Sequence, residues 1–185
     1  MRWVIKILGF LMAIIVLAVA IVAGVGAMLP KEHVATRAAH FREQPEAIWK
    51  AISTPAEFPK WRPEVRTVEI IPDASGHVLW VEHSGQGWSA QEVPYQMTEF
   101  VPPIAPMPGR MVTRIASPNL PYGGSWTYEL SAADGGTLLR ITEHGEVRNV
   151  IFRFVSRYIM GQTKTMEDYL NALGQKFGEK VSIQE

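Results

Sequence analysis

The stretch NVIFRFVSRYIMGQTKTMEDYLNALGQKF, from Asn149 to Phe177, decides the fold. At 100° per residue its apolar side chains fall on one helical face and its charged side chains fall on the opposite face. This period predicts one long amphipathic helix over 149–177, capped by Asn149 at its start. We expect its apolar face to cover another element, and that face consists of Ile151, Val155, Tyr158, Ile159, Met166, Tyr169, Leu170, Leu173 and Phe177.

Gln162 interrupts this apolar face near its centre. A polar side chain that is buried without a hydrogen-bond partner costs about 1–3 kcal/mol. We therefore expect the Gln162 amide to meet a polar partner or water in the interior.

The other end of the chain contains an apolar run from Ile7 to Leu29. A helix needs about 20 such residues to cross the hydrocarbon core of a bilayer. A cleaved signal peptide is the alternative, but its apolar core usually has only about 7–15 residues. We therefore predict a single-pass anchor over residues 7–29. Arg2 and Lys6 precede it, which places the N-terminus in the cytoplasm and the domain in the periplasm or outside the cell.

Pro30 ends the apolar run, and extended sequence begins almost immediately at Glu32. The sequence thus divides into an anchor (residues 1–30), one domain (31–178) and a short tail (179–185). Because no Gly/Ser-rich linker separates the first two parts, we expect the domain to lie against the bilayer surface.

The domain begins with extended sequence over 32–41, followed by two short helical units that start at Pro45 and Pro55. Further β-branched and aromatic runs are separated by short turns, which favours antiparallel pairing of neighbouring strands. The predicted fold is therefore α+β, with a curved antiparallel sheet of about seven strands wrapped round the terminal helix. The later strands are expected at 65–71, 78–82, 91–100, 110–115, 125–130 and 137–147.

Composition excludes several kinds of site. Lys+Arg and Asp+Glu are both 18, and this balance argues against nucleic acid as a partner, since phosphate contacts need clustered positive charge. The chain has no cysteine, which removes disulfides and thiolate nucleophiles. The five histidines lack metal-ligand spacing and are expected on the surface. We predict neither a metal site nor a cofactor.

Four segments resemble one known superfamily. They are Pro45-Glu46-Ala47-Ile48-Trp49, Phe58-Pro59-Lys60-Trp61, the strand 124–128 and the strand 136–143. Together they resemble the START-like (SRPBCC) superfamily, specifically its polyketide cyclase/dehydrase and lipid-transport group, over roughly 32–177. The resemblance implies a helix-grip fold with a cavity between the sheet and the terminal helix. Lipid carriers, cyclases and members without assigned activity share these motifs, so the resemblance specifies the fold better than the function.

Glu143 is the most informative polar residue of the predicted strands. It shares a strand face with Leu139, Ile141 and Val147, which we assign to the interior. A buried carboxylate needs a partner or becomes protonated. Gln162, Tyr158 and Tyr169 are candidate partners. The alternatives are a structural hydrogen bond at a sheet edge or an outward orientation of Glu143.

The preferred function is a membrane-anchored module that binds a lipid or another apolar small molecule. One alternative is a cyclase- or dehydratase-like enzyme with Glu143 as acid or base, although no nucleophile or metal pattern supports catalysis. Another is a membrane-surface interaction protein with exposed aromatic patches around Trp80, Trp88 and the proline-rich loop at 102–108. The candidate cavity residues are Tyr95, Met97, Trp126, Tyr128, Glu143, Tyr158, Gln162, Met166 and Tyr169.

Overall fold

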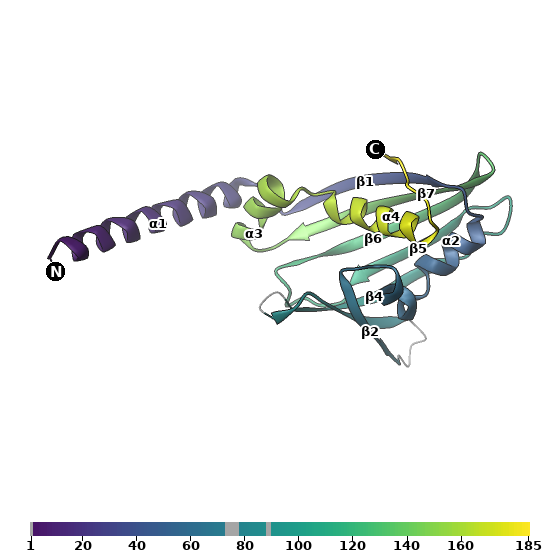
Figure 1. Cartoon of the computed structure of the whole chain (residues 1–185), viewed down its shortest axis with the longest axis horizontal. Coiled ribbons are helices and arrows are strands. Elements are labelled where there is room, and N and C mark those ends of the chain that lie inside the picture. Colours follow the sequence, from purple (N-terminus) through teal and green to yellow (C-terminus); the bar gives the residue numbers. More distant parts are fainter. Residues whose placement is uncertain (1, 73–77, 88–89) are drawn as a thin grey trace.

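The computed structural model describes residues 2–72, 78–87 and 90–185. A long helix, α1 (Arg2–Met28), projects from one end of a domain built on a curved sheet (Figure 1). The predicted apolar run is thus helical. Helix α1 is long and apolar enough to cross a membrane.

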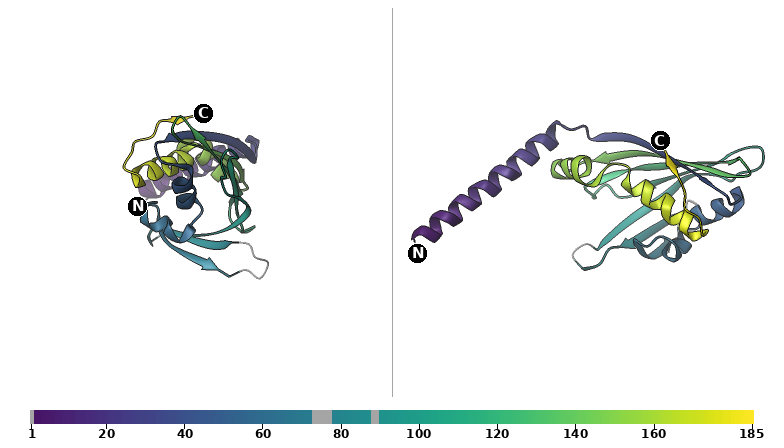
Figure 2. Two further views of the ribbon diagram at one scale, coloured as in Figure 1. Left: turned by 90° about the vertical axis from the view of Figure 1, so that its right-hand side faces the viewer. Right: turned by 45° about the horizontal axis from the view of Figure 1, so that its top comes forward.

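Within the described residues, the sheet contains eight antiparallel strands in the order β2-β3-β4-β5-β6-β7-β1-β8. It curls around the helices that cover its concave face (Figure 2). The predicted α+β helix-grip fold is confirmed. The strands are β1 (Glu32–Phe41), β2 (Val65–Ile71), β3 (Leu79–Ser84), β4 (Gln91–Val101), β5 (Gly109–Ile115), β6 (Tyr122–Ala133), β7 (Gly136–Val147) and β8 (Ile183–Gln184).

The eighth strand comes from the segment that the sequence suggested was only a tail. Strand β8 pairs with β1 at Ala38 and Ala39. Just before it, the Glu179 carboxylate accepts a hydrogen bond from Arg42 Nε at 3.2 Å. The last residues therefore pack against the domain and extend its sheet.

Two short helical elements, α2 (Pro45–Ile52) and η1 (Pro55–Lys60), lie where the two prolines predicted them. Each begins with proline at its first turn, where the missing N–H costs nothing. They bury Ile48, Ile52 and Phe58 against the far end of the concave face.

The single helix expected over 149–177 is divided into two parts in the structure. Helix α3 (Val150–Val155) continues into a π-helical turn, η3 (Ser156–Met160), and α4 (Lys164–Lys176) begins after a break. The Asn149 side chain caps α3 as predicted. Gly161 causes the break, because its φ of 79° belongs to the left-handed region that ends a right-handed helix.

The two parts direct their apolar faces differently. In α4, Met166, Leu170 and Leu173 are fully buried against the sheet, so this part forms the predicted cover. In the first part, Tyr158 and Ile159 are 60% and 70% exposed. Helix α3 and η3 lie beside the end of α1 instead of extending over the concave face (Figures 1 and 2).

The aromatic surface suggested near Trp80 is absent at that residue. Trp80 is only 3% exposed and belongs to the hydrophobic core. Trp88, the other residue of that suggestion, lies outside the described residues.

Candidate functional site

Strands β6 and β7 carry predicted cavity residues to the concave face. Trp126 pairs with Glu143, and two residues along the same strands Tyr128 pairs with Ile141. Alternate residues of a strand face the same side, and Ile141 is fully buried. Trp126, Tyr128 and Glu143 therefore all face the interior, as predicted from the sequence pattern.

Strand β4 contributes two further candidates. Met97 is buried in the core, and the Tyr95 ring stacks on Trp80 with their centroids 5.5 Å apart. On the neighbouring strand β5, Ile115 pairs with Tyr95 and is half-buried. The strand registers place these side chains on the same concave face as Trp126 and Glu143.

Tyr169 of α4 fills the interior at the middle of the sheet. Its ring centroid lies 5.2 Å from Trp61, 5.6 Å from Trp126 and 5.9 Å from Tyr128. Met166, one turn earlier in α4, is fully buried beside it. The space directly beneath α4 is therefore packed with aromatic rings at this level.

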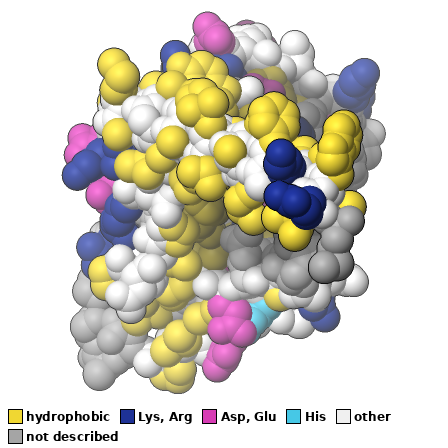
Figure 3. Space-filling model, turned by 90° about the vertical axis from the view of Figure 1, so that its left-hand side faces the viewer, with side chains coloured by type: hydrophobic (Ala, Val, Ile, Leu, Met, Phe, Trp, Pro, Cys, Tyr) yellow, Lys and Arg dark blue, Asp and Glu magenta, His cyan; other side chains and the backbone are white. Residues whose placement is uncertain are grey.

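Nearer to α1, beyond Tyr169, the concave face is open. The helical segment is interrupted at Gly161, so α4 does not extend this far. Figure 3 shows that this end of the domain is hollowed and lined with hydrophobic side chains. We call this concavity the hollow and define it by the concave-face positions Tyr95, Ile115, Trp126 and Glu143, all half-buried.

The partner of Glu143 differs from the one expected. Its Oε1 lies 3.7 Å from Nε2 of His33 in β1, and both side chains are mostly buried, with exposures of 21% and 14%. Gly145 makes room for this arrangement, because a Cβ at that position would overlap the His33 ring. Gln162 instead accepts a hydrogen bond from Arg157 Nη1 at 3.0 Å. The expected Glu143–Gln162 pair is thus replaced by two separate contacts.

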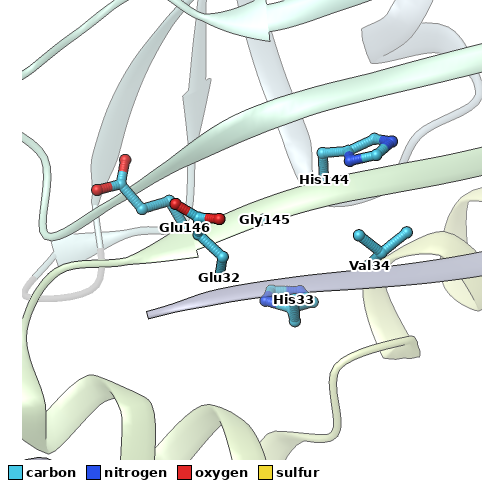
Figure 4. Close-up of a pocket in the computed structure, with 6 residues that line it drawn as sticks. All are labelled: Glu32, His33, Val34, His144, Gly145 and Glu146. Carbon is cyan, nitrogen blue, oxygen red and sulfur yellow. The ribbon is translucent and has the colours of Figure 1, made fainter. Parts of the chain in front are cut away.

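Two small cavities lie at this end of the domain, each with a volume of about 190 Å³. The first follows the adjacent ends of β1 and β7 (Figure 4), with Glu32, His144 and Glu146 in its wall. The second lies between the end of α1 and η3. It is lined by Leu29, Pro30, His33, Val147, Arg153, Ser156, Arg157 and Gln162.

The interior also contains a buried ion pair between Arg62 and Glu82, which was not predicted from the sequence. Arg62 Nη1 donates to Glu82 Oε1 at 2.9 Å, and Trp80 Nε1 donates to the same oxygen at 3.0 Å. The Arg62 guanidinium also lies 5.4 Å from the centre of the Tyr169 ring, in a cation–π arrangement. The strand alternation contained a signal, because Glu82 follows Trp80 by two residues and must share its face.

The tyrosines of the interior are held in their neutral form. Burial raises the pKa of Tyr128 to about 12, and burial also raises the pKa values of Tyr95 and Tyr169. Nearby, the buried Trp61 Nε1 has no hydrogen-bond partner among the residues that the structure describes. The interior therefore contains tyrosine hydroxyl groups and the Trp61 indole N–H as hydrogen-bond donors among its aromatic rings.

Besides Gln162, which lines the second cavity, one more predicted cavity residue lies away from the hollow. Tyr158 is in η3, 60% exposed, with its ring 5.0 Å from that of Phe154. The helical period placed Tyr158 on the same face as Tyr169, but the break at Gly161 separates the two parts of that face.

Comparison with known proteins agrees with this architecture. The sequence profile of the family described as polyketide cyclase / dehydrase and lipid transport matches residues 32–177. No curated protein sequence matches the chain.

Solved structures with the same fold have low sequence identity to the chain. A START superfamily protein from Mycobacterium smegmatis is 13% identical, with a TM-score of 0.58, covering 78% of this chain and 96% of its own. The Zhui aromatase/cyclase from a Streptomyces species is 11% identical, with a TM-score of 0.59, and the match covers 78% of this chain and 93% of that protein. Truncated norcoclaurine synthase from Thalictrum flavum is 13% identical, with a TM-score of 0.59, covering 80% and 94%.

Proposed function

Because the chain belongs to the polyketide cyclase / dehydrase and lipid transport family, we propose that it is a membrane-anchored binding module for a lipid or another apolar small molecule. Helix α1 would hold the module in the membrane, with the N-terminus in the cytoplasm and the domain on the opposite side. The hollow would receive the ligand.

The observation that carries this proposal is the uncovered apolar part of the concave face. Small-molecule sites are usually concave and mostly apolar, with a few fixed polar groups. The hollow combines the Trp126, Ile115 and Tyr95 side chains with one carboxylate, Glu143, and it is open at the end where α1 leaves the domain (Figure 3). An apolar molecule could therefore enter from the bilayer side without crossing much water.

Native mass spectrometry of the full chain, released from detergent micelles, tests the proposal. We expect a population that carries one apolar molecule. Replacement of Ile115 by tryptophan fills the hollow and should reduce that population several-fold. Its neighbour Arg114 is exposed and faces the opposite side of the sheet, so Arg114→Trp is the matched control. Equal occupancy in both variants would contradict binding in the hollow.

A second function, acid–base catalysis, is favoured by the His33–Glu143 contact. The Glu143 carboxylate, one of the groups that define the hollow, lies 3.7 Å from the His33 imidazole, and the two groups could exchange a proton with a bound substrate. Replacement of Glu143 by glutamine should abolish turnover of an identified substrate and leave its binding unchanged. Glu146→Gln, on the outer face of the same strand, is the control. Undiminished turnover in Glu143→Gln would exclude this role.

A further inference from the structure

The segment between β7 and α4 has a surface that neither the hollow nor the core uses. In α3 and η3, four apolar or aromatic side chains point outward: Ile151, Phe152, Tyr158 and Ile159, which are 42%, 43%, 60% and 70% exposed. We call them the α3–η3 patch. Exposed large apolar side chains that cluster on one short segment are typical of interaction surfaces.

The position of this patch is fixed by a close contact with α1. Gly26 is buried against α3, and a Cβ at this position would overlap the carbonyl oxygen of Val150. Gly26 lies only three residues before Leu29, the last residue of the apolar run, which corresponds to about 4.5 Å along a helix. Helix α3 therefore joins α1 at the depth of the last turn of the proposed membrane span.

Arg153 holds this joint together. Its guanidinium is buried and donates to the carbonyl oxygens of Gly26 and Leu29 at 3.3 and 3.4 Å. The same group donates to Val147 O at 2.8 Å and to Arg148 O at 3.0 Å. It thus satisfies carbonyl groups at the end of α1, where a cation is favourable, and connects them to the end of β7. The anchor and the domain are clamped together by these bonds.

The patch also borders the hollow. The Phe152 ring centroid lies 6.4 Å from that of Tyr122, at the start of β6 and on the concave-face register of Trp126. Arg148 and Arg157 are exposed on the same segment. Apolar side chains flanked by arginines are the composition of a segment that lies in the boundary between lipid tails and anionic headgroups.

We propose that the α3–η3 patch is a second membrane-contacting surface, whose side chains lie in the bilayer boundary beside α1. This inference rests on the proposed membrane anchoring and deepens it. The occupant of the patch is the lipid bilayer, because α3 packs directly against the end of the proposed membrane span and Arg153 clamps the two together. The opening of the hollow is then held against the membrane, where an apolar ligand would enter it directly.

Single-cysteine labelling tests this proposal, since the chain has no cysteine of its own. The full chain carrying Ile159→Cys is labelled with an environment-sensitive fluorophore and reconstituted in phosphatidylcholine–phosphatidylglycerol vesicles that contain spin-labelled lipids. Ile104→Cys is the matched control, because Ile104 is 64% exposed and lies in the β4–β5 connection at the opposite end of the sheet. Leu17→Cys reports on α1 itself.

We expect lipid quenching of the label at 159 to be several-fold stronger than at 104 and to approach that at 17. Strong quenching at 17 with equal, weak quenching at 159 and 104 would overturn the proposal and leave the anchor intact. Weak quenching at all three positions would overturn the membrane anchoring as well.

Two glycine variants test whether the clamp positions the patch. In the Ile159→Cys chain, Gly26→Val should force α3 away from α1 and reduce quenching at 159 at least twofold. Gly24→Val is the matched control, because a Cβ at Gly24 has no neighbour within 4 Å. Identical quenching in the two variants would contradict a patch that is placed by its contact with α1.

Discussion

Replacing Glu82 with leucine is expected to destabilise the domain by about 3 kcal/mol, because it leaves the Arg62 guanidinium without its buried partner. Glu82 is only 6% exposed, and its carboxylate accepts hydrogen bonds from both Arg62 and Trp80. Leucine fills a similar volume but supplies no hydrogen-bond acceptor to Arg62 or Trp80.

The magnitude follows from what remains around Arg62. Removing one partner of a buried ion pair usually costs about 3–5 kcal/mol, because the other charge stays buried. Arg62 keeps a second carboxylate, since its Nε donates to Glu64 at 2.7 Å, and the Glu64 side chain is 48% exposed. This remaining contact places the expected loss at the lower end of the range. Burial alone would lower the pKa of Arg62, but the charge of Glu82 and other neighbours keeps it raised, so the guanidinium stays protonated.

Urea denaturation of the full chain in detergent micelles, followed by tryptophan fluorescence, measures this loss. Removing both charges in Arg62→Leu/Glu82→Leu should bring stability back to within about 1 kcal/mol of the unmodified chain. Glu69→Leu, at an exposed carboxylate on β2, should change stability by no more than about 0.5 kcal/mol. If Glu82→Leu is as stable as the Glu69→Leu control, or if the double variant is as unstable as the single one, the loss does not come from an unpaired Arg62 charge.

Three further perturbations have defined outcomes. Hydrogen bonds from Thr163 and Arg37 hold the pKa of Glu167 below its ordinary value. The contribution of the Glu167 carboxylate to stability is therefore present above the unfolded pKa of about 4.3 and is lost as pH falls through the folded pKa. Glu167→Gln should flatten the acid side of a plot of melting temperature against pH, and an unchanged plot would contradict this. Burial raises the pKa of Tyr128 to about 12, so stability should fall as pH rises above about 10, where the unfolded tyrosine ionises first; tyrosinate absorbance that titrates fully before unfolding would show otherwise. Arg153→Met removes the bonds to the end of α1 and should increase amide hydrogen exchange in α3 about tenfold or more; exchange confined to its original rate would exclude a clamping role.

The elements of the fold were predictable because their signals are local. The apolar run of 7–29, the strand patterns and the two prolines of α2 and η1 each determine a structure from neighbouring residues. The terminal helix was only partly predictable. Gly161 fits within an amphipathic period as easily as any small residue, and the period does not report whether its backbone adopts a positive φ.

The candidate site was less predictable, because it depends on contacts between distant strands. The alternating pattern of β7 predicted that Glu143 faces the interior. Its partner depends on the register of β1 against β7, which brings His33 opposite Gly145. Arg62 follows a turn, where no period indicates the direction of its side chain. Its burial becomes evident only when β3 places Glu82 beside it.

Photo-crosslinking in a bilayer measures whether the hollow holds an apolar molecule. The full chain is reconstituted in vesicles containing a diazirine-bearing fatty acid, irradiated, digested and mapped by mass spectrometry. Helix α1 should be labelled from the bilayer in any case. If the hollow holds an apolar molecule, the concave-face residues Ile115 and Trp126 should be labelled as well, and the label at Trp126 should be lost in Ile115→Trp. Labelling confined to α1 and α3, with none in β5 or β6, would contradict it.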